Sequence, residues 1–161
     1  MDQDGDVPEV RPPTLDDVRR ICRALEEAGA RYVLIGGFAV ILHGGLRTTK
    51  DIDLLVDPAP ENVERLKQAL SILEDRAVED VGPDDLERYT VVRVADEVMV
   101  DLLASACGVT WSEARPVARR VDLDGVPVVV ADRETLIRTK RTVRPSDAAD
   151  RAWLEASRDE E

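Results

Sequence analysis

A short apolar run, Tyr32 to Ile35, constrains the fold more than any other segment, because it stops abruptly at Gly36-Gly37. The run is too brief for a helix and is bounded as a buried strand is. A second run, Asp51 to Val56, alternates acidic and apolar residues before it reaches Asp57-Pro58, which again predicts a strand. Because segments with helical periodicity surround both runs, we expect a domain of mixed helices and short strands.

Apolar spacing and helix-bounding residues predict the helices. Thr14 has the side chain of an N-cap and Gly29 is a typical stop, so a helix is expected between them. Further helices are expected over residues 38–42 and 60–73 and, near the C-terminus, after Asp132 and from Ser146.

Two antiparallel hairpins complete the predicted elements. Asp124-Gly125 supplies the positive φ of a tight turn between the runs 121–123 and 126–130. The runs 89–94 and 98–103 predict the other hairpin. Residues 1–13 contain acids and prolines but few apolar side chains, so we expect a disordered tail at 1–13 and a single domain over 14–158.

Composition argues against several classes of function. The net charge of -12 has the wrong sign for nonspecific DNA binding, and one Phe, two Tyr and two Trp cannot form a stacking platform. No apolar stretch approaches the roughly 20 residues that cross a bilayer, and the first residues are acidic, unlike a signal peptide. Cys22 and Cys107 indicate ordinary thiols in a reducing compartment. A cytoplasmic protein without membrane contact is therefore expected.

Asp51, Asp53 and Asp101 are the candidate metal ligands. Asp51 and Asp53 lie two apart on a strand, so their side chains leave one face with Cα atoms about 6 to 7 Å apart. Mg²⁺ or Mn²⁺ would relieve their repulsion. Taken alone, the pair is explained more simply by solvated acids at a strand edge. Asp101 favours the metal site, since a lone charge buried within the run 98–103 is costly unless it is paired or metal-bound. The alternative interpretation of Asp101 is an open strand face with one polar position.

Gly36-Gly37 lies where a strand meets a helix, and there bare backbone can approach a phosphate. By itself the pair also fits an ordinary tight turn. The order of features is more specific: an apolar strand, Gly-Gly, 13 intervening residues, Asp-x-Asp, and a separate strand with one Asp. In this order the segment from Tyr32 to Leu103 resembles the nucleotidyltransferase superfamily with the polymerase-beta-like fold.

Within that superfamily the chain looks most like the AbiEii-like branch of bacterial abortive-infection toxins and its small relatives. Arg-x-Ser/Thr-x-Asp-x-Asp recurs in that branch, and Arg47, Thr49, Asp51 and Asp53 reproduce it. The C-terminal Lys140, followed by the segment 144–150, is similar to the closing Lys-containing segment of the branch. The resemblance implies an α/β fold of the α+β type, in which a small mixed sheet is flanked by helices and followed by two C-terminal helices.

The resemblance also implies an activity: metal-dependent transfer of a nucleoside monophosphate from an NTP to a hydroxyl or phosphate acceptor, with release of pyrophosphate. Two Mg²⁺ or Mn²⁺ ions would be held by the catalytic residues Asp51, Asp53 and Asp101. The nucleotide, ATP or another NTP, would be bound by a second group of residues, namely Gly36, Gly37, Arg47, Thr49 and Lys140.

The acceptor stays open between tRNA, a protein and a small molecule. Phe38 stands where many superfamily members have Ser, and Ser146 where toxin-like relatives have Lys, so two phosphate contacts are missing. The chain is also shorter than the abortive-infection toxins, and a partner protein or a homodimer would complete the acceptor site. The alternative function is a non-catalytic nucleotide- or metal-binding regulatory module of a toxin-antitoxin-like pair.

Other polar and aromatic residues are interpreted as structural. His43 is expected at a helix end. Trp111 and Trp153 are expected to pack in the core. We expect a solvated surface at Arg115, Arg119 and Arg120. Asp147 and Asp150 are interpreted as charges at a helix N-terminus.

Overall fold

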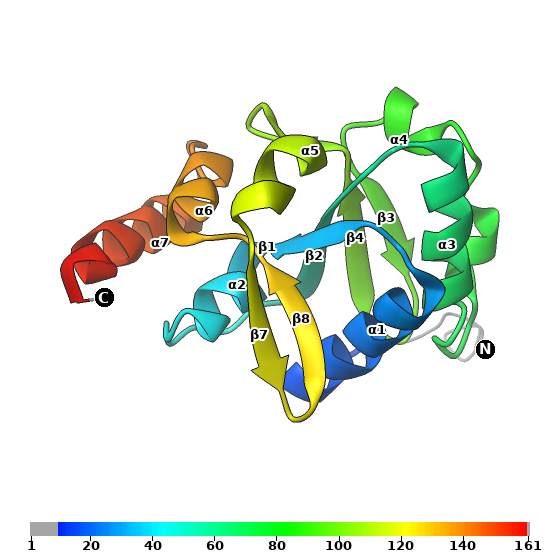
Figure 1. Cartoon of the computed structure of the whole chain (residues 1–161), viewed down its shortest axis with the longest axis horizontal. Helices are drawn as coiled ribbons and strands as arrows, with labels where there is room; N and C mark the ends of the chain where they lie inside the picture. The colour runs from blue at the N-terminus through cyan, green and yellow to red at the C-terminus, as the bar shows by residue number, and fades with distance from the viewer. Residues whose placement is uncertain (1–9, 161) are drawn as a thin grey trace, which may run out of the picture.

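The computed structural model describes residues 10–160, which form seven α-helices, eight strands and short 3-10 turns (Figure 1). The helices are α1 Leu15–Ala28, α2 Gly36–Leu42, α3 Pro60–Leu70, α4 Asp85–Arg88, α5 Trp111–Ala114, α6 Arg133–Thr139 and α7 Pro145–Ala156. The strands are β1 Tyr32–Ile35, β2 Asp51–Val56, β3 Val92–Ala95, β4 Met99–Leu103, β5 Ser105–Ala106, β6 Val109–Thr110, β7 Arg119–Leu123 and β8 Val126–Val130. The mixed α/β fold predicted from the sequence is confirmed.

One mixed, six-stranded sheet organises the domain, in the order β3-β4-β2-β1-β8-β7. The pairs β1·β2, β3·β4 and β7·β8 are antiparallel, whereas β2·β4 and β1·β8 are parallel. β1 and β2 therefore occupy the centre, and the two predicted hairpins form opposite edges. Because β1 runs antiparallel to β2, the end of β1 lies beside the start of β2, where the conspicuous glycines and aspartates fall.

Helices α1 and α3 pack against each other, and α6 and α7 lie at the opposite end of the domain beside α2 (Figure 1). Thr14 caps α1 through a capping box with Asp17, and Gly29 ends the helix at a φ of 68°. The apolar side chains of α1 are buried from Val18 to Leu25, whereas Leu15 at the start of the helix is exposed. The central side chains of the sheet, including Leu34, Ile52 and Leu54, are fully buried. These buried rows hold the strands of the site in fixed register.

Several element boundaries differ from the predicted ones. The helix expected from Phe38 begins at Gly36, and the helix expected to reach Leu73 ends at Leu70. The strand expected from Tyr89 begins only at Val92, because residues 85–88 form the short helix α4 and Tyr89 is its cap. Such single-turn elements depend on tertiary packing more than on periodicity.

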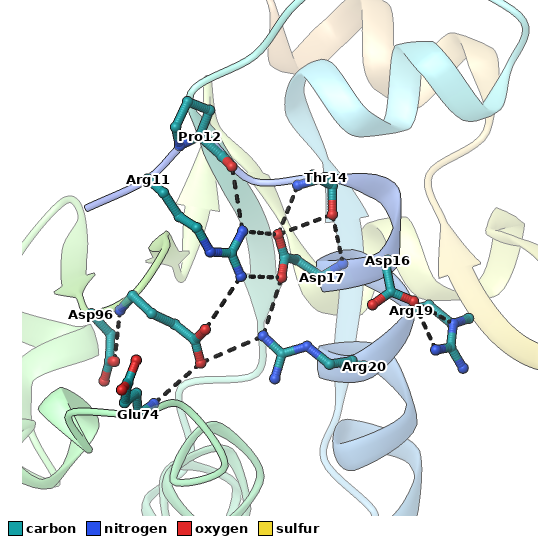
Figure 2. A network of polar contacts seen from close by, with 10 residues as sticks. Arg11, Pro12, Thr14, Asp16, Asp17, Arg19, Arg20, Glu74 and Asp96 are labelled. Carbon is teal, nitrogen blue, oxygen red and sulfur yellow. Dashed lines mark hydrogen bonds and ion pairs between the residues drawn. The ribbon is translucent and has the colours of Figure 1, made fainter. Parts of the chain in front are cut away.

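Residues 1–9 of the expected tail lie outside the described residues. At the start of the described chain, Arg11 donates two hydrogen bonds of 2.7 Å to the buried Asp17 on α1 (Figure 2). Arg11 and Arg20 also pair with Glu97, in the turn between β3 and β4. These ion pairs hold the segment before α1 against the turn that connects β3 and β4.

Within residues 10–160, none of the helices is both long and apolar enough to span a bilayer. The two cysteines are separate: Cys22 is buried in the core and Cys107 is exposed. Burial raises the pKa of the Cys22 thiol to about 12.

Candidate active site

Four neighbouring strands place their site residues in one cross-strand row. Ile35 at the end of β1 lies opposite Asp53 on β2, Asp53 lies opposite Asp101 on β4, and Asp101 lies opposite Arg93 on β3. Residues paired in this way project from the same face of a sheet. Asp51 joins that face because it precedes Asp53 by two residues. The register therefore brings together the three aspartates predicted from the sequence.

Asp51, Asp53 and Asp101 form a compact carboxylate cluster, with one oxygen from each lying within 4.8 Å of the others. Asp101 is buried and the other two are partly exposed. Burial, followed by the charges of Asp101 and Asp51, raises the pKa of Asp53 to about 7. Burial and the nearby Asp101 also raise the pKa of Asp51. The negative charges of these carboxylates are therefore not fully compensated by nearby cations.

Gly36 and Gly37 allow the backbone after β1 to lie directly against this cluster. Gly36 has a φ of 77°, and a Cβ atom there would lie 2.9 Å from Cγ of Asp53. A Cβ atom on Gly37 would lie 2.7 Å from Cβ and Oγ1 of Thr49 and 3.3 Å from the Arg47 guanidinium carbon. The glycine pair is therefore required for the close approach of Asp53 and Thr49, whatever it contacts in a ligand.

Lys140 lies at the end of α6, on the other side of the site. It is 5% exposed, and its Nζ is 2.9 Å from Asp150 and 3.8 Å from Asp147. Arg47 also pairs with Asp150, so α7 links two of the predicted nucleotide-binding residues. Asp147 lies in the first turn of α7, as expected of a helix N-terminal charge, whereas Asp150 lies beyond it. Both are also buried and pair with cations beside the site, a role that the sequence did not predict.

Asp147 is held in its charged form despite its burial. Burial alone would raise its pKa, but the hydrogen bond from Thr142 and the charges of Lys140 and Arg144 outweigh that effect and lower it. Thr142 Oγ1 donates to Asp147 Oδ2 at 2.5 Å, and Arg144 Nε is 3.3 Å from the same oxygen. The loop between α6 and α7 is thereby fixed against the cluster.

Two adjoining cavities meet at the aspartates. The larger, about 420 Å³, extends from Asp53 and Asp101 toward the β5–β6 turn at Cys107. The smaller, about 260 Å³, extends over Gly37. It includes the remaining predicted nucleotide-binding residues Gly36, Arg47, Thr49 and Lys140. Both cavities share Asp51, Asp53, Lys140 and Arg144, so a single ligand can extend through both.

The donor set fits a divalent cation. All three ligand groups are carboxylates, the oxygen donors that Mg²⁺ and Mn²⁺ prefer, and their spacing allows them to share an ion. Burial first, and then the negative charge of Asp101, raise the pKa values of both Asp51 and Asp53, so the charged carboxylates lack full compensation when no cation is bound. A cation with more than one charge would supply that compensation.

Sequence reasoning missed Arg93 and gave Arg144 no role. Both line the larger cavity, and Arg93 Nε and Nη2 donate to the two oxygens of Asp101 at 2.9 and 3.0 Å. Arginine alternates with valine in β3, which is the signal of an outward-facing residue, but only the pairing with β4 shows that Arg93 faces Asp101. Sequence spacing cannot reveal that register.

The other residues interpreted as structural, unlike Asp147 and Asp150, lie away from the aspartates. His43 caps α2, and its Nε2 lies 2.9 Å from the Ala131 carbonyl oxygen. Arg115 and Arg120 line a separate cavity with Trp111, near the start of β1. Trp111 and Trp153 are partly buried and pack against the core.

Comparison with known proteins supports the same assignment of fold. A Thermotoga maritima crystal structure of a proposed nucleotidyltransferase is similar with a TM-score of 0.57 and 17% identity, over 92% of this chain and 96% of that one. No curated protein sequence matches the chain. The model of one family, described as the nucleotidyl transferase AbiEii toxin of type IV toxin-antitoxin systems, matches residues 19–151. The chain therefore belongs to the AbiEii nucleotidyltransferase family.

Proposed function

We propose that this protein transfers a nucleoside monophosphate from an NTP to a hydroxyl or phosphate acceptor, with Asp51, Asp53 and Asp101 as its catalytic residues. One observation carries the proposal. The three carboxylates, the Gly36-Gly37 backbone and the buried Lys140 all border the same pair of adjoining cavities. Carboxylates with an adjacent cation and bare backbone are what a triphosphate bound with divalent metal requires.

In the proposed reaction an acceptor oxygen forms a bond to the α-phosphorus. The bond between that phosphorus and the oxygen bridging to the β-phosphate breaks, and pyrophosphate leaves with the electron pair. A hydroxyl acceptor loses its proton to a carboxylate of the cluster or to water. Two bound Mg²⁺ or Mn²⁺ ions would supply Lewis-acid stabilisation of the phosphate oxygens, and Asp51, Asp53 and Asp101 would hold them.

The chain's own cations and backbone would orient the nucleotide. Lys140 is positioned by Asp150 and Asp147 and borders both cavities, so it can offset charge on the departing phosphates. Arg47 and Thr49 border the smaller cavity, above Gly37. We assign the triphosphate to this smaller cavity and the nucleoside to the larger one.

The family description adds a partner to the proposal. The AbiEii family is described as a type IV toxin, which implies a cognate antitoxin and a nucleotide substrate. We therefore propose that the protein acts in the cytoplasm as the toxin of such a pair. Its two unpaired thiols fit a reducing compartment.

The test is a transfer assay with each of the four NTPs labelled at the α-phosphate, in Mg²⁺, with tRNA, protein and cationic antibiotic offered as separate acceptors. We expect label on one acceptor and an equal amount of pyrophosphate. Asp101→Asn should abolish both, whereas Asp80→Asn, an equal charge change on an exposed turn, should leave them unchanged.

Two results would contradict the proposal. Transfer that persists in Asp101→Asn would remove that residue from the reaction. Nucleotide binding by the wild type without transfer to any acceptor would favour the non-catalytic regulatory module.

A further inference from the structure

Arg93 makes the tightest contact with the carboxylate cluster, yet the proposed reaction gives it no task. Its Nε and Nη2 donate to Oδ1 and Oδ2 of Asp101 at 2.9 and 3.0 Å, and Nη2 lies 3.6 Å from Asp51. The contact is the side-on, two-bond geometry in which a guanidinium matches a carboxylate. Arg93 thus occupies oxygen atoms that a metal ion would also need.

The two sides of this ion pair differ in their freedom to move. Asp101 lies on the inner strand β4 with its side chain 7% exposed, whereas Arg93 lies on the edge strand β3 with its side chain 57% exposed. Removing the counter-charge from a buried carboxylate is costly, but an exposed arginine regains hydration when it leaves. Asp101 is therefore the fixed member of the pair and Arg93 the exchangeable one.

The negative charge of the carboxylate cluster favours replacement of Arg93 by a divalent cation. Three carboxylates gather within 4.8 Å, and a divalent cation bound among them would lie close to the guanidinium. Like charges at that separation repel, and the divalent ion compensates the cluster more fully than one guanidinium does.

From these observations we infer that Arg93 is an exchangeable counter-ion: it neutralises Asp101 and Asp51 in the metal-free protein and is displaced when a divalent ion binds the same oxygens. The inference rests on the proposed function, since it takes the cluster as the metal site. It goes further by assigning Arg93 a role as competitor, which lowers metal affinity. A fixed orienting role for Arg93 has the opposite consequence, because its loss would then weaken metal binding.

The experiment measures binding of Mn²⁺ alone, from the electron paramagnetic resonance signal of the free ion, to the wild type and Arg93→Gln. We expect Arg93→Gln to bind Mn²⁺ about tenfold more tightly, because one opposing charge is removed near the ion. Arg93→Lys, which keeps the charge but loses the fork, should stay nearer to the wild type.

Arg120→Gln is the matched control. Arg120 lies on β7, the opposite edge of the sheet, its side chain is 55% exposed, and it pairs with Glu26 at 3.5 Å. The control loses the same charge, so any change common to both variants reflects net charge alone. We expect its Mn²⁺ affinity to stay within about twofold of the wild type, since screening removes long-range effects.

Thermal unfolding provides a second readout. In a chelator Arg93→Gln should unfold at a lower temperature than the wild type, because the acids lose their counter-ion, and Mn²⁺ should remove or reverse that difference. Equal or weaker Mn²⁺ binding by Arg93→Gln, with normal binding by the wild type, overturns the counter-ion role and leaves the proposed function standing. Absence of Mn²⁺ binding in both folded proteins overturns the metal site and the inference together.

Discussion

Gly36→Ala tests whether the site depends on the close approach of the Gly36 backbone to Asp53. The new Cβ atom would lie 2.9 Å from Cγ and 3.0 Å from Cβ of Asp53. Rotation of the carboxylate relieves only the first contact, because Cβ of Asp53 is fixed by strand β2. Asp53 must therefore shift from its present position, which changes its distance to Asp101 on the neighbouring strand β4.

The expected cost has two parts. Alanine at a positive φ costs about 1 to 2 kcal/mol, and the overlap adds about 1 to 3 kcal/mol, as in overpacked cores. Gly29→Ala isolates the first part, because Gly29 has a φ of 68° and open space within 4 Å of the added atom. We therefore expect Gly29→Ala to lose about 1 to 2 kcal/mol of unfolding free energy and Gly36→Ala about 2 to 5 kcal/mol.

Denaturant unfolding and Mn²⁺ titration of both variants provide the measurements. Gly36→Ala should bind Mn²⁺ at least about tenfold more weakly than the wild type, because a ligand is displaced, whereas Gly29→Ala should bind normally. Equal unfolding free energies and equal Mn²⁺ affinities for the two variants would refute the reasoning, since they would mean that the added atom never reaches Asp53.

Three further predictions concern the nucleotide site, the N-terminal ion pair and the core. Lys140→Gln should weaken binding of the triphosphate about tenfold or more, whereas Lys67→Gln, on the distant helix α3, should leave that binding unchanged; both are checked by calorimetry. The hydrogen bonds from Arg11, and to a smaller extent those from Thr14, hold the pKa of Asp17 below its usual 3.8. The charged Asp17 therefore stabilises the fold above about pH 4, and this contribution is lost as the pH falls below that value. Asp17→Asn should accordingly lower the unfolding free energy by about 2 kcal/mol at pH 7, as for a charged hydrogen bond, and by less at pH 3; a pH-independent loss would count against the ion pair. Leu54→Ala, at a fully buried position of β2, should cost about 2 to 5 kcal/mol in chemical denaturation, and a loss below about 1 kcal/mol would contradict the central placement of that strand.

Local signals in the sequence predicted the elements that depend on local chemistry. Thr14 and Gly29 bound α1 as expected, and Asp124-Gly125 forms the turn between β7 and β8. In these cases a few neighbouring residues carry the signal, so one sequence suffices. The grouping of Asp101 with Asp51 and Asp53, which the structure brings together, came instead from the resemblance to the nucleotidyltransferase superfamily, because Asp101 lies on a separate strand.

Features that depend on strand register or on the packing of distant segments could not be predicted. The sequence shows neither that Arg93 lies opposite Asp101 nor that Asp150 neutralises both Lys140 and Arg47. These contacts join segments up to 103 residues apart, and such pairing is set by packing of the whole domain. The single-turn helices α4 and α5 were missed for a related reason, because one turn has no periodicity to detect.

The central claim, that Asp51 and Asp53 create a metal-dependent nucleotide site, is tested most directly by calorimetric titration of each NTP with and without Mg²⁺. The wild type should bind at least one NTP only when Mg²⁺ is present, and the Asp51→Asn/Asp53→Asn variant should lose that binding while remaining folded. Mg²⁺-dependent binding that survives in the double variant, or wild-type binding that needs no Mg²⁺, would contradict the account and place the nucleotide elsewhere.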